Sequence, residues 1–114
     1  MAEFDIIHDY FQSKTLIRDD VILPIGDDAA VVKIPSNKHQ VIAVDTLNAG
    51  VHFFPDCPAD AIGHKALAVN LSDLAAMAAQ PAYFTLALSL EENNATWLND
   101  FSTGLFQCAA DYNL

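Results

Sequence analysis

The sequence predicts one small domain that mixes helices and strands, in the order helix, strand, strand, helix, strand, helix. Apolar residues recur every three or four positions in the first and last of three helical segments, as they do in amphipathic helices, and the middle segment, 59–79, is rich in small, helix-prone residues. Between these segments lie short β-branched and aromatic runs bounded by Pro, Gly, Asn and Asp, which is typical of strands. The chain has 114 residues, 53% of them hydrophobic, and this is enough for a single domain with a buried core.

The first 24 residues predict a short helix followed by an irregular connection. Residues 3–13 place four side chains on one helical stripe: Phe4, Ile7, His8 and Phe11. Residues 14–24 show no comparable period and end at Pro24. We therefore expect an amphipathic helix over 3–13 and a loop over 14–24.

Two neighbouring apolar runs predict a β-hairpin. The first, Ala29 to Ile34, is stopped by Pro35, and the second covers about residues 40–47. The polar residues SNKH between them form a turn signal. Because the two runs are so close in sequence, we expect them to pair with each other.

A long helix is predicted from Ala59 to Ala79. Asp56 or Asp60 is placed to cap its start, and Pro81 stops it. Gly63 is a point at which the helix could break. We expect this helix to carry the small apolar stretch ALAVNLSDLAAMAA, with a single carboxylate in its middle.

A third strand over 82–90 and a last helix complete the predicted order. Asn94 or Thr96 can cap this helix. Its apolar stripe predicts core packing: Leu98, Phe101, Leu105, Cys108 or Ala109, and Tyr112. No cap is expected after Tyr112, and the chain is therefore predicted to be a truncated domain.

The composition narrows the classes of function. Fifteen acidic residues face five basic ones, which gives a formal charge of −10. Phosphate backbones repel such a surface, so direct nucleic-acid binding is not expected. No apolar run reaches the roughly 20 residues of a membrane-spanning helix. The acidic start MAEFD does not resemble a signal peptide. Cys57 and Cys108 have no metal-type spacing, so we expect two free thiols in a cytoplasmic protein.

Four aspartates stand out as candidate metal ligands: Asp27, Asp28, Asp45 and Asp73. Asp27 and Asp28 precede the first predicted strand, Asp45 ends the second, and Asp73 lies on the long helix. None of the five cations is an obvious local partner, whereas Mg²⁺ binds through one or two carboxylates together with substrate phosphates. The alternatives remain an Asx turn at Asp27–Asp28, a turn cap at Asp45 through Thr46, and a solvated Asp73.

Three stretches resemble the thiamine-monophosphate kinase family. They are IGDDAAVV (25–32), VDTLNAGVHF (44–53) and GHKALAVNLSDLAAMAAQP (63–81), and their order and spacing agree as well. More broadly, the chain looks like the aminoimidazole-ribotide-synthetase superfamily, whose members bind ATP in an Asp-rich cleft that holds magnesium. The similarity covers most of the chain.

The resemblance implies a fold, a reaction and a set of site residues. The fold would be α+β, with helices on one face of a small mixed or antiparallel sheet that pairs across a homodimer. The reaction would transfer the γ-phosphoryl group of ATP to thiamine monophosphate and give thiamine diphosphate. Asp28, Asp45 and Asp73 match magnesium ligands with Asp27 beside them, and His52 matches a contact to thiamine phosphate.

The resemblance also shows departures and leaves other functions open. The family has hydroxyl residues where Ala43 and Val44 stand, and often glycine where Ala78 stands. It continues into a Gly-Gly-Asp-Thr strand and a second domain, so residues 1–114 are expected to be an incomplete N-terminal ATP- and magnesium-binding and dimerisation domain that is inactive by itself. Two alternatives are another ATP-dependent enzyme of the superfamily and a non-catalytic dimerisation module.

Overall fold

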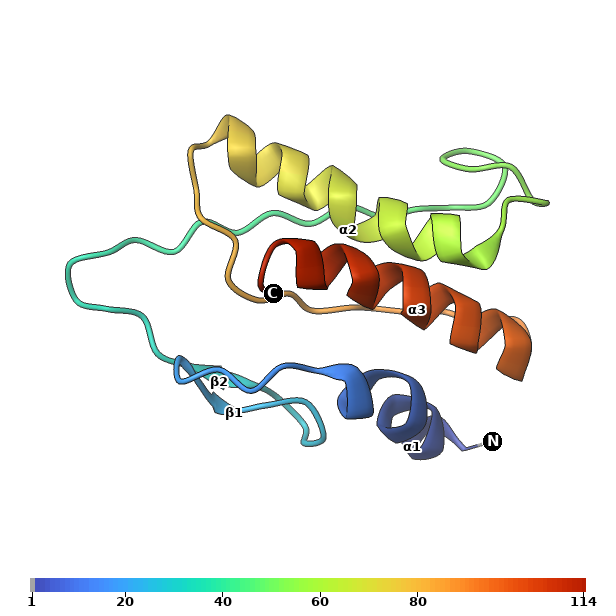
Figure 1. The fold of residues 1–114 in the computed structure, drawn as a ribbon, viewed down its shortest axis with the longest axis horizontal. Helices are drawn as coiled ribbons and strands as arrows, with labels where there is room; N and C mark the ends of the chain where they lie inside the picture. The colour runs from blue at the N-terminus through green and yellow to red at the C-terminus, as the bar shows by residue number, and fades with distance from the viewer. Residues whose placement is uncertain (1) are drawn as a thin grey trace. The chain divides into compact units, whose positions relative to one another are not determined.

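The computed structural model describes residues 2–114, which form two compact units. The first unit ends at Gln40 and the second covers Val41–Leu114. Each unit is described by itself (Figure 1). The first contains five short elements: α1 (Glu3–Ile6), η1 (Ile7–Phe11), η2 (Gln12–Lys14), β1 (Val21–Leu23) and β2 (Val31–Val32). The second contains two helices: α2 (Ala59–Ala76) and α3 (Ala95–Asp111).

The predicted helix over 3–13 is confirmed as helical chain, but it changes its winding. The α-helical turn α1 passes into the π-helix η1 and then into the 3₁₀-helix η2. A π-helical turn holds more residues than an α-helical one, so it rotates the side chains that follow it. The predicted stripe is therefore partly wrong: Phe11 is buried, but Ile6 is buried in place of Phe4, which is 80% exposed.

The observed two-stranded sheet uses a different partner from the predicted hairpin. β2 pairs antiparallel with β1, through Val21 opposite Val32 and Leu23 opposite Val31. The pairing expected between 29–34 and 40–47 is therefore wrong, and so is the loop expected over 14–24. The chain reverses between β1 and β2 where Gly26 takes a φ of 115°, which favours glycine. The turn that joins the two paired strands is therefore at Gly26, and not at the SNKH stretch, residues 36–39.

α2 and α3 pack side by side and form the core of the second unit (Figure 1). The predicted α3 stripe is confirmed at Leu98, Phe101, Leu105, Cys108 and Ala109, all of which are buried, whereas Tyr112 is 53% exposed. α2 runs unbroken through Gly63, which is buried where the helix meets the Phe101 backbone of α3. Cys57 and Cys108 are free thiols, as predicted.

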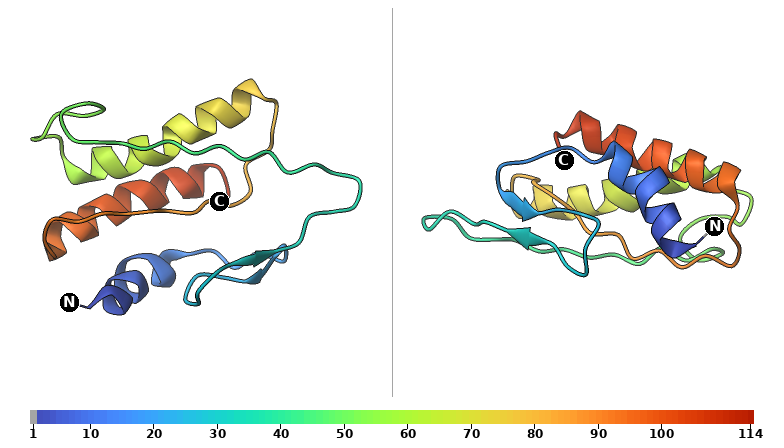
Figure 2. Two further views of the ribbon diagram at one scale, coloured as in Figure 1. Left: turned by 180° about the vertical axis from the view of Figure 1, so that it is seen from behind. Right: turned by 90° about the horizontal axis from the view of Figure 1, so that it is seen from below.

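Two extended segments, 41–48 and 82–90, lie on the same side of the α2–α3 pair (Figure 2). Neither forms a named strand within residues 2–114, so both strands predicted there are wrong as paired elements. A strand needs a ladder with a neighbouring strand, and the only sheet of the described residues is the β1–β2 pair. Ile42 is 80% and Val44 is 88% exposed as a result. The α+β class is confirmed by the antiparallel pair and the helices.

The two long helices begin in different ways. Asn94 caps α3, as predicted, because its Oδ1 accepts a hydrogen bond of 3.0 Å from the Trp97 amide. α2 begins after Pro58, with no side-chain cap, so the predicted cap at Asp56 or Asp60 is wrong. Asp60 lies in the first turn instead, where its carboxylate accepts a hydrogen bond of 2.9 Å from the Ala61 amide. Its negative charge there interacts favourably with the positive end of the helix dipole.

Both long helices end in the same hydrogen-bonded turn. After α2, the Ala78 amide donates to the Ala75 carbonyl and the Ala79 amide to the Leu74 carbonyl, the paired bonds of a Schellman motif. This ends the helix at Ala76, short of the predicted Ala79. α3 repeats the pattern, with Leu114 donating to Ala109, so the expectation that no cap follows Tyr112 is wrong.

The Schellman turn after α2 predicts that Ala78→Gly stabilises the chain. Ala78 has a φ of 54°, in the left-handed region that costs an L-residue about 1 kcal/mol or more and glycine almost nothing. Part of this relief is lost, because glycine also gains conformational entropy in the unfolded chain. We therefore expect the free energy of unfolding to rise by about 0.5–1 kcal/mol. Urea denaturation followed by circular dichroism measures this. The control is Ala75→Gly, an exposed position in the last turn of α2 with ordinary helical backbone, which should destabilise the chain.

Candidate functional site

Asp27 and Asp28 lie in the exposed turn between β1 and β2. The Asp27 carboxylate accepts a hydrogen bond of 2.8 Å from the Asp28 amide, which holds the two residues in a local turn. Gly26 packs against the side-chain amide of Gln12, which would lie 3.0 Å from a Cβ at this position. Both carboxylates face solvent, so they keep free oxygen atoms for a ligand.

Asp45 and Asp73 are exposed carboxylates of the second unit. Asp45 lies in the extended segment 41–48 and Asp73 in the last turns of α2. Within residues 2–114, neither side chain makes a hydrogen bond or an ion pair. Only the Asp73 carbonyl is engaged, by the Met77 amide at the helix end. Asp73 thus faces water rather than a cation, where an unpaired carboxylate costs little.

The structure brings Asp27 and Asp28 together in one turn of the first unit. Among residues 2–114, no group of three His, Cys, Asp or Glu side chains has the arrangement to hold a metal ion. Asp27 and Asp28 belong to the first unit, and Asp45 and Asp73 belong to the second. The magnesium site therefore stays a prediction.

Two of the five cations are engaged elsewhere. Arg18 forms a two-pronged contact with Asp20, from Nε to Oδ1 at 2.8 Å and from the guanidinium NH2 group to Oδ2 at 2.9 Å. The hydrogen bond from Arg18 lowers the pKa of the Asp20 carboxyl and outweighs the opposing effect of desolvation. Lys65 donates to the His52 carbonyl oxygen. Lys65, the cation of α2, is therefore engaged with the loop at His52 and not with Asp73.

His52 lies in a compact loop that folds back on itself. The His52 amide donates to the Asn48 carbonyl at 2.9 Å, and the Gly50 amide donates to the Phe53 carbonyl at 2.8 Å. Gly50 has a φ of 78°, which allows this tight reversal. The Asn48 amide in turn donates to Nδ1 of the His52 ring at 2.9 Å. The loop therefore fixes both the backbone and the ring of His52, whose side chain is exposed.

Asn70 carries an unsatisfied polar atom that the sequence did not reveal. Its Nδ2 donates to the Ala66 carbonyl at 2.9 Å, whereas its Oδ1 is buried and has no partner within residues 2–114. Asn70 precedes Asp73 by three residues, so the two share one helix face. The shared face could be predicted from the three-residue spacing, whereas burial of one oxygen of Asn70 depends on how α2 packs.

An open groove of about 420 Å³ between α2 and α3 contains none of the predicted site residues. Its lining mixes polar and apolar surface: Asp60, Ala61, His64, Thr103, Gly104, Gln107 and Asp111. It lies where Gly104 lets the two helices approach, since a Cβ there would meet the Asp60 backbone. The groove is therefore separate from the candidate metal ligands Asp27, Asp28, Asp45 and Asp73.

Comparison with known proteins identifies the family. Residues 26–114 match the AIR synthase related protein, N-terminal domain. The chain belongs to this AIR synthase related family. The match begins at Gly26 and includes Asp27, Asp28, Asp45, His52 and Asp73. The resemblance drawn from the three motifs is confirmed at the level of the family.

Individual relatives point to one member of the AIR synthase related family. The chain is 50% identical over 114 residues to a thiamine-monophosphate kinase of Escherichia coli K12, with 99% of the chain covered. It is 44% identical over 114 residues to the enzyme of that name from Haemophilus influenzae, and 40% over 92 residues to the one from Bacillus subtilis, with 79% of the chain covered. The chain spans 35% of the length of the first two relatives and 28% of the third.

No helix within the described residues 2–114 has the length and apolar character needed to cross a bilayer. The longest helix, α2, has 18 residues and carries Asp60, Lys65 and Asp73.

Proposed function

We propose that this chain is the N-terminal, ATP- and magnesium-binding part of a thiamine-monophosphate kinase. The observation that carries the proposal is identity of 44–50% to kinases of that name across nearly the whole chain. The full-length protein would transfer the γ-phosphoryl group of ATP to the phosphate of thiamine monophosphate, in the cytoplasm. The chain by itself would be inactive, because relatives are about three times longer.

The residues present suit phosphoryl transfer between two anionic substrates. This reaction needs positioning and charge stabilisation rather than a protein nucleophile. The acceptor phosphate oxygen is already anionic, so no strong general base is required. His52 presents an exposed ring from a rigid loop, and a ring N–H can donate to a phosphate oxygen of the acceptor.

The four aspartates fit magnesium by their donor chemistry. Asp28, Asp45 and Asp73, with Asp27 beside them, would hold it through exposed carboxylate oxygens, which are the ligands this hard cation prefers. Bound Mg²⁺ would neutralise charge on the polyphosphate. Ala43 and Val44 have no hydroxyl group to bind the metal, so at these two positions the backbone carbonyl oxygens would be the ligands. Until substrate is bound, the exposed Asp45 and Asp73 remain hydrated and need no counter-ion.

A homodimer is part of the proposal. Segments 41–48 and 82–90 have no strand partner within residues 2–114, and the first of them exposes Ile42 and Val44. Unpaired extended chain with apolar side chains is a surface that folded proteins normally cover. Pairing of sheets across a second copy would cover it and would satisfy the backbone groups.

The proposed reaction is tested with the full-length protein, ATP, Mg²⁺ and either thiamine monophosphate or thiamine. We expect ³¹P NMR to show thiamine diphosphate formed from the monophosphate, and no product from thiamine. His52→Asn keeps an oxygen near the position of Nδ1 but removes the outer N–H, so we expect the KM for thiamine monophosphate to rise about tenfold while the KM for ATP is unchanged. Phosphorylation of thiamine, or of neither compound, would overturn the proposal.

A further inference from the structure

The loop at residues 48–53 fixes which nitrogen of His52 carries the proton. The Asn48 amide donates to His52 Nδ1 at 2.9 Å. A nitrogen that accepts a hydrogen bond must keep its lone pair, so the proton of the neutral ring sits on Nε2. The exposed side chain therefore presents Nε2–H as a donor to solvent or ligand.

The ring stays in this orientation only while the backbone of the loop stays in place. The donor to the ring and the acceptor of the His52 amide both belong to Asn48, so ring and backbone share one anchor. Gly50 lies at the tip, with no side chain within 4 Å of the site where a Cβ would stand. The tip makes few packing contacts, and hydrogen bonds must supply the order.

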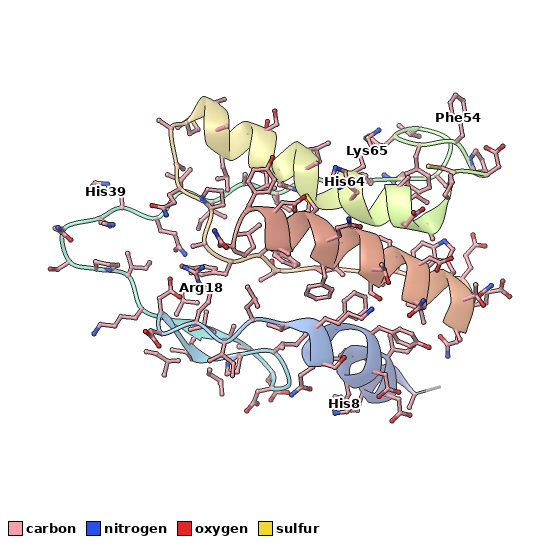
Figure 3. All side chains as sticks on the ribbon, viewed as in Figure 1. His8, Arg18, His39, Phe54, His64 and Lys65 are labelled. Carbon is pink, nitrogen blue, oxygen red and sulfur yellow. The ribbon has the colours of Figure 1, made fainter. Side chains whose placement is uncertain are left out.

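Lys65 ties this loop to α2. Its ammonium group donates to the His52 carbonyl oxygen from a residue 13 positions further along the chain. Figure 3 shows the Lys65 side chain extending from α2 toward the loop that carries Phe54. α2 is itself held against α3 by the buried Ile62 and Leu67, on either side of Lys65. The lysine thus connects the exposed loop to the rigid part of the unit.

We propose that Lys65 is a positioning residue for the acceptor substrate, acting through His52. Its hydrogen bond to the His52 carbonyl holds the loop so that Nε2–H faces the phosphate group of a phosphomonoester. The inference rests on the proposed function, in which His52 contacts the phosphate of thiamine monophosphate. The charged donor suits this role, since hydrogen bonds from charged groups are stronger than neutral ones.

The kinetic test uses Lys65→Met and Lys65→Arg in the full-length protein. We expect Lys65→Met to raise the KM for thiamine monophosphate about tenfold, with the KM for ATP and the unfolding midpoint unchanged. Lys65→Arg should recover most of the loss, because a guanidinium group also donates to a carbonyl. Lys38→Met is the matched control, since Lys38 lies exposed in the turn after Pro35 and should change neither KM.

A double variant separates positioning from direct contact. If Lys65 acts through His52, then Lys65→Met combined with His52→Asn should be no worse than His52→Asn alone. If the two losses multiply instead, Lys65 contacts the substrate by itself and the positioning role is overturned.

The ring of His52 gives a readout that does not depend on the kinase reaction. In ¹⁵N NMR spectra of this chain, Nδ1 should appear unprotonated and Nε2 protonated, and Lys65→Met should shift both signals toward a tautomer average. Unchanged ring signals in Lys65→Met would overturn the inference even if the full-length protein is a kinase. Absence of phosphorylation with a shifted ring would overturn the proposed function and leave the role of Lys65 in the loop intact.

Discussion

Gly104→Ala is expected to destabilise the α2–α3 pair by about 3 kcal/mol or more, at the upper end of the cost of overpacking. A Cβ at this position would lie 1.9 Å from the Asp60 carbonyl oxygen and 2.6 Å from its carbon. Carbon and oxygen atoms that are not bonded approach to about 3.3 Å at closest. The atoms in the way belong to the backbone of α2, so no side chain can rotate to make room.

The expected sign is informative because helix propensity acts in the opposite direction. In an unconstrained helix, Gly→Ala stabilises by about 1 kcal/mol. Gly104 is buried in the middle of α3, so alanine must overcome that gain before any loss of stability is seen. To accept the methyl group, α3 would have to move away from α2 by about 1 Å or more, since the contact must lengthen from 1.9 Å to about 3.3 Å. This movement would loosen the packing of Leu105 and Phe101.

Urea denaturation monitored by circular dichroism measures the effect, and Gln107→Ala is the control. Gln107 is exposed on the same helix, one turn away, and its replacement should change the free energy of unfolding by no more than about 0.5 kcal/mol. A Gly104→Ala variant as stable as the parent chain would show that the two helices do not cross as closely as the structure has them.

Gly63 provides a second test of the same crossing. Its Cβ would lie 2.1 Å from the Phe101 carbonyl oxygen on α3. Once Gly104→Ala has pushed the helices apart, there is also more room for a Cβ at Gly63. Adding Gly63→Ala should therefore cost less than it does in the parent chain, since mutations that share one displacement are not additive.

The contrast between α3 and the extended segments shows what sequence patterns can predict. The α3 stripe was predicted well because its evidence is local: residues three and four apart share a helix face, and the buried Leu98 and Leu105 follow that spacing. The strands were predicted poorly because a strand is defined by a partner that can lie anywhere in the chain. The strand Val31–Val32 pairs with Val21–Leu23, which lies earlier in the chain, whereas the segment 41–48 pairs with no strand within residues 2–114.

The candidate site divides in the same way. The residue types and motif spacing around Asp27, Asp45 and Asp73 indicated the family correctly. The contact of Lys65 with the His52 carbonyl and the buried oxygen of Asn70 were not predictable, because each depends on how α2 faces a segment distant in sequence. One feature of the sequence could have drawn attention to Lys65: it is the only lysine or arginine on the long predicted helix, 59–79.

Asp73→Asn is expected to abolish Mg²⁺-dependent nucleotide binding without lowering the stability of the fold. Losing a direct carboxylate ligand should cost at least as much as losing a supporting residue of a metal site, roughly 100-fold in affinity. The side chain is exposed and makes no hydrogen bond or ion pair with another residue of 2–114, so stability should change by no more than about 0.5 kcal/mol. Any change should be a gain, because the chain has a formal charge of −10.

The measurement is an NMR titration with Mg²⁺ and a non-hydrolysable ATP analogue, first in this chain and then in the full-length protein. We expect shifts centred on Asp28, Asp45 and Asp73 that disappear in Asp73→Asn. Asp100→Asn is the matched control, since it removes one negative charge from an exposed position on α3. If both variants weaken binding equally, the acidic residues act only through net charge. If Asp73→Asn binds as the parent does, Asp73 is not a ligand, and a non-catalytic dimerisation module then explains an exposed carboxylate on α2 better than a kinase does.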